Sequence, residues 1–247
     1  MFSNSALLNQ YESLQTRLLR YYPGEHELQT AQYQINKEKK FVITRELRIH
    51  LNKSKNGITA QISTSARRAA GILSAGIKLA HSHQLLYVVT PLKLTRTERS
   101  SHANLLILDL RSKELMWFEP HGSDPTATGH PTAMLNYYEP EQIDHVLKRI
   151  LGSLEERHLL RLLTPCDLKL SPVWGQSVTA DSYCSFWCLL FFDYTIRGRR
   201  SEFIDRINML TVQGRQELQR FIDVQLMDST NLLRELMRHN STAALPT

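Results

Sequence analysis

The sequence predicts an α+β fold in which a central, antiparallel-rich sheet is flanked by helices. Three observations predict it. Short apolar segments typical of strands gather in the middle of the 247-residue chain, at 85–89, 103–110 and 114–119. Segments with apolar residues at helical spacing lie on both sides of them. Strands that cluster in the sequence, with the helices kept apart, are typical of α+β domains rather than of domains with alternating strands and helices.

Residues 1–80 are expected to form an N-terminal extension of helices and a hairpin. The expected elements are a helix at 6–19, a strand at 41–51, a strand at 58–62 and a helix at 65–79. Apolar residues three and four apart mark the two helices. The turn signal Asn56-Gly57 separates the two strands, and this dipeptide is typical of a tight hairpin.

Residues 81–200 are expected to form the core of the protein. The polar link 111–113 between the strands at 103–110 and 114–119 is short, so these strands should be antiparallel neighbours. The segment Pro120-His121-Gly122 should end the second of them as a rigid, exposed turn. A loop is expected at 125–140.

Two helices and a strand complete this core. A helix should begin at Pro140, because proline suits a first-turn position and apolar residues follow it at helical spacing. A strand is expected within 159–170. Residues 183–194 are almost entirely apolar or aromatic, which predicts a helix buried on every side. Beyond the core, 201–240 should form amphipathic helices and 241–247 a disordered tail.

Composition and the number of cysteines indicate which partners and which cellular compartment to expect. The chain is 42% hydrophobic and 22% charged, as in an ordinary folded domain, and the net charge of +6 permits contact with nucleic acid through a basic surface. Three cysteines (Cys166, Cys184 and Cys188) do not make a disulfide framework and favour a reducing intracellular compartment. No targeting segment is evident, and the apolar runs are too short to cross a membrane.

Four residues in the core combine the groups that a thiol protease needs. Cys184 begins the predicted buried helix, where the helix dipole favours a thiolate. His102 stands after a polar loop at 95–101 and just before a strand, and Glu119 ends the next strand. Antiparallel pairing of these two strands places His102 beside Glu119. Gln176, in a glycine-containing loop before Cys184, can supply an amide to the same pocket.

Four short motifs around these residues resemble those of a known clan. They are His-Ala-Asn at 102–104, Phe-Glu-Pro-His-Gly at 118–122, Gly-Gln at 175–176 and Tyr-Cys-Ser-Phe-Trp at 183–187. Together, and in this order, they resemble the adenain and SUMO-protease clan of cysteine proteases. Within it they are most similar to the adenovirus maturation protease and to uncharacterised homologues in large DNA viruses. The resemblance covers about residues 85–194.

The resemblance implies a papain-like fold and a cysteine endopeptidase that processes viral structural or polyprotein precursors in the host cytoplasm, the nucleus or the virion. Cys184 is then the nucleophile, His102 the base and acid, Glu119 the residue that orients His102, and Gln176 an oxyanion donor. The partner is a protein substrate, and no cofactor or metal is implied. The chain departs from the clan at Ala103, where tryptophan is usual, and at Ser185, where glycine is frequent; its loop from Gln176 to Cys184 is also longer.

Other interpretations remain open. The same chemistry serves a ubiquitin or ubiquitin-like isopeptidase, and an effector-type acyltransferase uses a similar triad. An inactive structural or DNA-binding protein with the same fold is the non-enzymatic alternative.

Several nearby residues have a simpler interpretation than catalysis. Cys188 is expected to be core packing, and no third ligand turns Cys184 and Cys188 into a metal pair. His121 is expected to have a structural or substrate-contacting role. Asp181 competes with Gln176 for shaping its loop. The arginine-rich segment at 197–200 is expected to be a solvated helix end.

Overall fold

The computed structural model describes residues 14–22, 25–26, 33–54, 57–97, 100–122, 140–154, 160–170 and 184–208. Its strands are β1 (Glu25–His26), β2 (Gln34–Asn36), β3 (Phe41–Ile43), β4 (Leu47–Ser54), β5 (Gly57–Ile62), β6 (Tyr87–Thr97), β7 (Ser100–Asp109), β8 (Glu114–Phe118) and β9 (Arg161–Leu163). Its helices are α2 (Leu14–Tyr21), α3 (Ala66–Ser82), α4 (Pro140–Gly152), α6 (Cys184–Ile196) and α7 (Arg200–Asn208).

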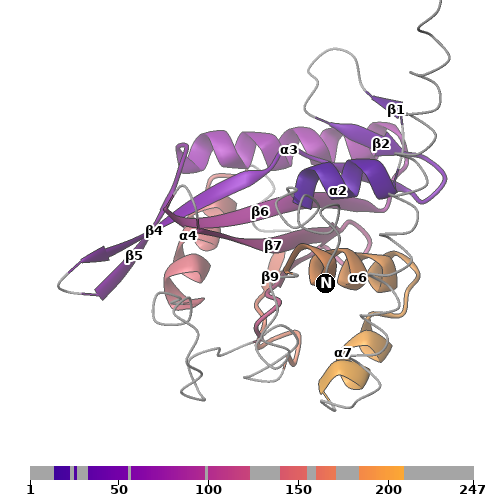
Figure 1. Ribbon diagram of the computed structural model, residues 1–247. Helices are drawn as coiled ribbons and strands as arrows, with labels where there is room; N and C mark the ends of the chain where they lie inside the picture. Colours follow the sequence, from indigo (N-terminus) through magenta and orange to yellow (C-terminus); the bar gives the residue numbers. More distant parts are fainter. Residues whose placement is uncertain are drawn as a thin grey trace, which may run out of the picture.

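One mixed sheet organises these elements. Strand β6 pairs with β7, and β7 with β8, both antiparallel. Along its other edge β6 pairs in parallel first with β3 and then with β4. The hairpin of β4 and β5 extends from this edge (Figure 1). The long strand β6 therefore joins the N-terminal half of the sheet to the half that carries β7 and β8.

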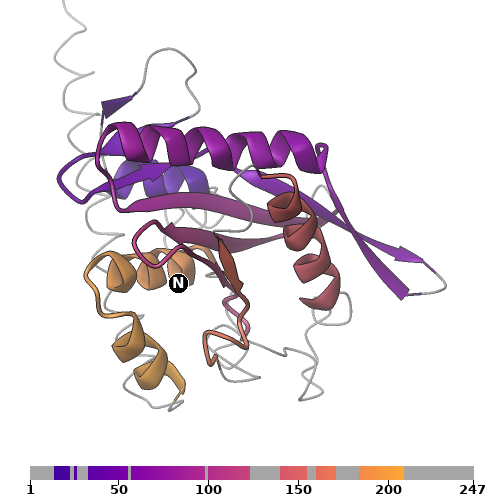
Figure 2. The same cartoon turned by 180° about the vertical axis from the view of Figure 1, so that it is seen from behind.

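Alternating side chains of the strands feed two hydrophobic cores, one on each face of the sheet. In β7, Leu105 and Ile107 belong to the core shared with α2, α6 and α7, whereas Leu106 and Leu108 belong to the core shared with α3 and α4. This period of two is what a strand buried on both faces requires. The result is a sheet covered by helices on both sides (Figures 1 and 2).

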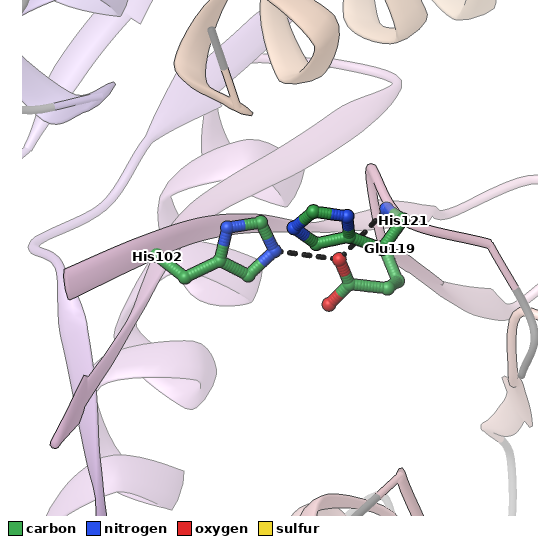
Figure 3. Close-up of side chains that lie close together, drawn as sticks. All are labelled: His102, Glu119 and His121. Carbon is green, nitrogen blue, oxygen red and sulfur yellow. Dashed lines mark hydrogen bonds and ion pairs between the residues drawn. The ribbon is translucent and has the colours of Figure 1, made fainter. Parts of the chain in front are cut away.

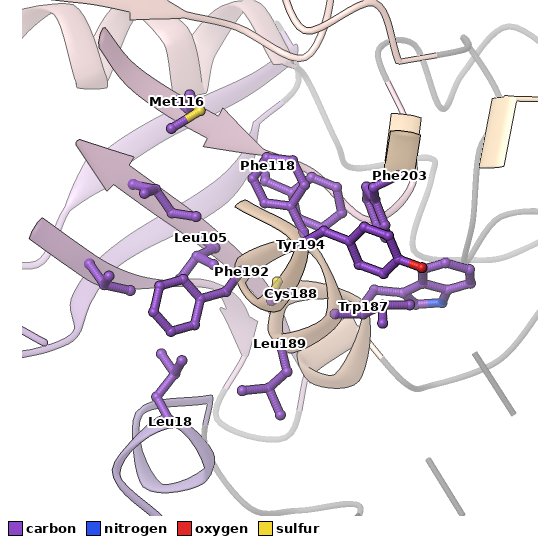
Figure 4. Packing of buried hydrophobic residues seen from close by; sticks show 14 of the residues in the cluster. Leu18, Leu105, Met116, Phe118, Trp187, Cys188, Leu189, Phe192, Tyr194 and Phe203 are labelled. Atoms are coloured by element: carbon purple, nitrogen blue, oxygen red, sulfur yellow. The ribbon is translucent and has the colours of Figure 1, made fainter. Parts of the chain in front are cut away.

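Helix α6 is enclosed on nearly every side, as its composition predicts. Ten of its residues are buried. Phe191 stacks on Phe118 of β8 with ring centroids 4.2 Å apart. Figure 4 shows Phe192 and Trp187 projecting to opposite sides of the helix, with Cys188 between them. Because a helix so enclosed cannot rotate without losing these contacts, its first residue, Cys184, is held at a fixed place relative to β7 and β8.

The α+β class and most of the expected elements are confirmed. The expected hairpin forms between β4 and β5, with Ser54 opposite Gly57, and α3 begins after Ser65, whose hydroxyl caps it by accepting from the Arg68 N–H. Helices α4 and α6 also lie where they are expected. The antiparallel pairing of β7 with β8 is the pairing that the short link predicts.

Three boundaries are corrected. The single strand expected at 41–51 is two strands, because Leu47 is four residues after Ile43 whereas their partners on β6, Leu92 and Val89, are three apart, so one extra residue interrupts the ladder. The strand expected at 85–89 is the much longer β6. Only the short β9 forms within 159–170, where a turn follows it.

Some segments predicted from the sequence lie outside the described residues. They are the loop at 125–140 apart from Pro140, the start of the first helix, most of 201–240 and the tail at 241–247. The expected extension and the expected core share one sheet, since β3 and β4 pair with β6.

Two glycines of α3 test how tightly this helix packs on the sheet. A Cβ atom at Gly76 would lie 2.8 Å from Thr44 Cγ2 and 2.9 Å from Val88 Cγ1, whereas one at Gly71 meets nothing within 4 Å. We expect Gly76→Ala to destabilise the protein by about 1–3 kcal/mol through overpacking. Gly71→Ala should stabilise it by about 0.5–1 kcal/mol through helix propensity. Denaturant unfolding of both variants measures the difference; equal shifts would contradict the close packing.

Candidate active site

The pairing of β7 with β8 brings His102 and Glu119 together. The register runs from Asp109 opposite Glu114 to Leu105 opposite Phe118, so the start of β7 lies beside the end of β8. His102 lies near the start of β7, and Glu119 directly follows β8. His102 Nε2 and Glu119 Oε1 are 2.6 Å apart (Figure 3). The proximity predicted from the strand pairing is therefore confirmed.

The partners of Glu119 define the tautomer of His102. An ionised carboxylate only accepts hydrogen bonds, so the proton between the two side chains is on His102 Nε2. Glu119 Oε1 also accepts the backbone N–H of His121, at 2.9 Å. With Nε2 committed to Glu119, Nδ1 is the ring nitrogen left to exchange a proton with another group.

Cys184 supplies that other group. It is the first residue of α6, and its Sγ accepts the backbone N–H of Ala103, the residue after His102, at 3.4 Å. The first N–H groups of a helix have no partner within it and stabilise a nearby negative charge. Cys184 is partly exposed, whereas Cys188, one turn further on, is fully buried. A partly exposed sulfur beside a histidine and a helix start is accessible to an electrophile.

The charges in this cluster favour an ion pair between sulfur and imidazole. Burial acts to raise the pKa of Cys184, but the hydrogen bond and the charge of His102 outweigh it, and the pKa lies below its usual 9.0. Burial acts to lower the pKa of His102, but Glu119 and Cys184 together raise it to about 10. For Glu119, the same histidine outweighs burial and lowers the pKa. A thiolate, an imidazolium and a carboxylate therefore stabilise one another.

Cys188 has the opposite environment. Burial raises the pKa of its thiol well above 9.0, and Sγ contacts the carbonyl oxygen of Ala103 at 3.6 Å. A buried thiol of this kind behaves as a small apolar side chain, which agrees with the packing role expected from the sequence.

The surroundings of His121 and His102 differ from the sequence-based expectation. His121 is buried rather than exposed, and its ring centroid lies 4.7 Å from that of His102. The turn 120–122 closes back on the site because Gly122, with a φ of 106°, donates its N–H to the Glu119 carbonyl at 3.1 Å. His102 itself lies within β7 rather than after a loop, since β6 continues to Thr97.

Arg17 is a further residue beside the start of α6, and the sequence pattern did not indicate it. This residue of α2 is buried, and the carbon of its guanidinium lies 4.2 Å from the ring centroid of Phe186, two residues after Cys184. A desolvated cation over an aromatic ring stabilises the contact between helices by about 2 kcal/mol. The signal for it in the sequence is weak, because one arginine in an amphipathic helix normally reaches solvent.

Two of the candidate residues, Gln176 and Asp181, lie outside the described residues, so the role of Gln176 stays a prediction. Asp109 is at the far end of β7, where its carboxylate receives Arg111 Nη2 at 2.8 Å. This carboxylate therefore lies at the opposite end of the strand from His102.

The arginines of the segment 197–200 form ion pairs with carboxylates. Arg197 contacts Asp193 at 2.9 Å, Arg199 contacts Glu202, and Arg200 lies 3.8 Å from Glu114. These carboxylates reduce the positive potential that a nucleic acid would meet at this helix end. The described helices include none that is long and apolar enough to span a membrane.

Comparisons with known proteins give one weak similarity. No family model matches the chain, and no solved structure matches it. A putative ankyrin repeat protein of Acanthamoeba polyphaga mimivirus is 24% identical over 132 residues, covering 47% of this chain. The matching part spans 16% of the length of that protein, so the similarity concerns a small portion of it.

Thiol reactivity tests the electrostatics of the site. We expect iodoacetamide to alkylate Cys184 at neutral pH and to leave Cys188 unmodified. Because the pKa of Cys184 is lowered, its alkylation rate should rise with pH through a midpoint below 9. Peptide mapping separates this label from that on the exposed Cys166. A midpoint at or above 9, or equal labelling of Cys184 and Cys188, would show that the ion pair does not form.

Proposed function

We propose that the chain is a cysteine endopeptidase of the adenain and SUMO-protease type, with a papain-like fold, that processes viral structural or polyprotein precursors. The observation that carries the proposal is the position of Cys184: at a helix start, against the backbone of Ala103, beside a His102 ring bonded to Glu119 at 2.6 Å. This is the arrangement of nucleophile, base and orienting acid that thiol hydrolysis needs.

The first half of the reaction follows from these contacts. The proton of the Cys184 thiol passes to His102 Nδ1, and the thiolate attacks the scissile carbonyl to form the C–S bond. His102, now an imidazolium stabilised by Glu119, then gives the Nδ1 proton to the leaving amine as the C–N bond breaks. The product is an acyl-enzyme on Cys184 and a free amine.

The second half regenerates the enzyme. Neutral His102 takes a proton from water, and the resulting hydroxide attacks the thioester carbonyl. The C–S bond breaks, and the thiolate and imidazolium pair forms again. The oxyanion of each tetrahedral intermediate needs hydrogen-bond donors, and we assign this role to the Cys184 backbone N–H and to Gln176.

Two further points support this function over an inactive protein with the same fold. Burying a histidine and a carboxylate costs free energy unless the two groups stabilise each other. A lowered pKa favours the reactive thiolate form of Cys184, which a thiol that only packs in a core does not need.

Substitution of the nucleophile and the base tests the proposal. Cys184→Ala and His102→Ala should each abolish cleavage of a substrate protein, because neither the acyl-enzyme nor the proton transfer can form. Cys188→Ala, one helical turn away, is the matched control and should cost about 1 kcal/mol of stability with little effect on kcat. Near-normal turnover by Cys184→Ala would rule out the proposed enzyme. Vinyl-sulfone probes built on ubiquitin or SUMO separate an isopeptidase from an endopeptidase.

The charge of Glu119 is tested by Glu119→Gln. The backbone N–H of His121 also donates to Oε1, so the amide oxygen of glutamine should keep that place and the His102 tautomer. The imidazolium loses its anionic partner, so the pKa of His102 should fall below its value of about 10. We expect kcat to drop by about 10²-fold, and the alkaline limb of kcat/KM to move to lower pH. An unchanged pH profile would mean that another group stabilises the imidazolium.

A further inference from the structure

We propose that His102, Glu119 and His121 form a zinc-binding site, in which a Zn²⁺ ion replaces the proton between His102 and Glu119. The inhibition that follows from it rests on the proposed function, whereas the binding of zinc does not. No metal was expected from the sequence, because no Cys or His at ligand spacing completes a site with Cys184 and Cys188.

The ligand atoms are already gathered. One ring nitrogen from each histidine and one carboxylate oxygen of Glu119 all lie within 4.8 Å of one another, and all three residues are buried (Figure 3). Zinc bonds to nitrogen and oxygen are about 2.0–2.2 Å long, which places the ligands of a tetrahedral site roughly 3.3 Å apart. Side-chain shifts of about 1–2 Å are enough to reach this geometry.

The carboxylate provides an independent indication of a cation. Glu119 is completely buried, and its Oε1 accepts both hydrogen bonds, from His102 and from His121. Its Oε2 is buried with no hydrogen-bond partner among the described residues. A buried acceptor without a partner costs about 1–3 kcal/mol. Zinc bound through Oε2 satisfies this oxygen, while Oε1 keeps the backbone N–H of His121.

The chemistry of the ligands favours zinc over magnesium and calcium. Two imidazoles and one carboxylate suit zinc, whereas magnesium and calcium prefer sites made of oxygen ligands. Three protein ligands leave the fourth position of a tetrahedral zinc site to water. The cluster of candidate ligands consists of His102, Glu119 and His121 and does not include the sulfur of Cys184.

Zinc at this place stops the proton transfers of the proposed reaction. His102 releases its Nε2 proton to solvent and coordinates the ion through that nitrogen, so the only proton left on the ring is at Nδ1. The ring then has no lone pair with which to take the proton of Cys184. It also cannot protonate a leaving amine without becoming an imidazolate. Zinc therefore acts as a reversible inhibitor that competes with protons.

The binding test uses a chain without an accessible thiol. Cys166→Ser and Cys184→Ala are combined in the full-length, metal-free protein, and ZnCl₂ is titrated in competition with a chromophoric chelator. We expect one zinc ion per chain. Adding His121→Phe keeps an aromatic ring against His102 but removes the ligand, and should weaken binding by at least about 10–100-fold, the loss that removal of even an outer partner of a zinc ligand causes.

Matched controls separate this site from adventitious binding. His81→Phe, at an exposed position of α3, should leave the affinity unchanged. Glu119→Gln should weaken binding as His121→Phe does, and melting temperatures without zinc verify that each variant is folded. Magnesium at the same concentration should not displace zinc.

Two results would overturn the proposal: an unchanged affinity in folded His121→Phe, or loss of zinc binding on Cys184→Ala alone, which would assign the ion to the thiolate. Both are measured on a chain without the nucleophile, so they do not depend on the proposed peptidase activity. In the enzyme with Cys184, zinc should inhibit cleavage reversibly by EDTA, and His121→Phe should raise the inhibitory concentration by the same factor as it weakens binding. Failure of the proposed function appears separately, as absence of any cleavage that depends on Cys184.

Discussion

The antiparallel pairing of β7 with β8 is the constraint on which the rest of the site depends. This pairing holds His102 beside Glu119. The apolar side chains of β7 and β8 that face α6 form the surface on which this helix packs. Phe118 of β8 stacks on Phe191 of α6 with ring centroids 4.2 Å apart, directly before Glu119 in the sequence. The contact that holds the helix therefore also sets the distance from Cys184 to the histidine and carboxylate.

Three ionisable groups lie close together in a largely apolar environment, where each alone would be neutral. Burial by itself raises the pKa of Glu119 and Cys184 and lowers that of His102. Their mutual attraction reverses every one of these shifts. Removal of one member consequently affects the other two, and the cluster acts as a unit rather than as three independent residues.

His121 gives this cluster a second use. Its backbone holds the carboxylate of Glu119 in place, while its ring lies against the ring that carries the proton. With the His121 ring as a third ligand, the histidine and carboxylate pair fits a zinc ion in place of the proton. The proposed catalysis and the proposed zinc binding therefore compete for the same lone pairs of His102 and Glu119.

The sequence by itself determined the α+β class, the hairpin, the buried character of α6 and the meeting of His102 with Glu119. Each follows from local information: apolar periodicity, a turn dipeptide, or a link too short for any but antiparallel strands. Only the tertiary structure decided that an extra residue interrupts 41–51, that β3 and β4 join β6 in parallel, and that His121 is buried. These depend on contacts between segments distant in the chain, and the periodicity of one segment carries no information about what covers it.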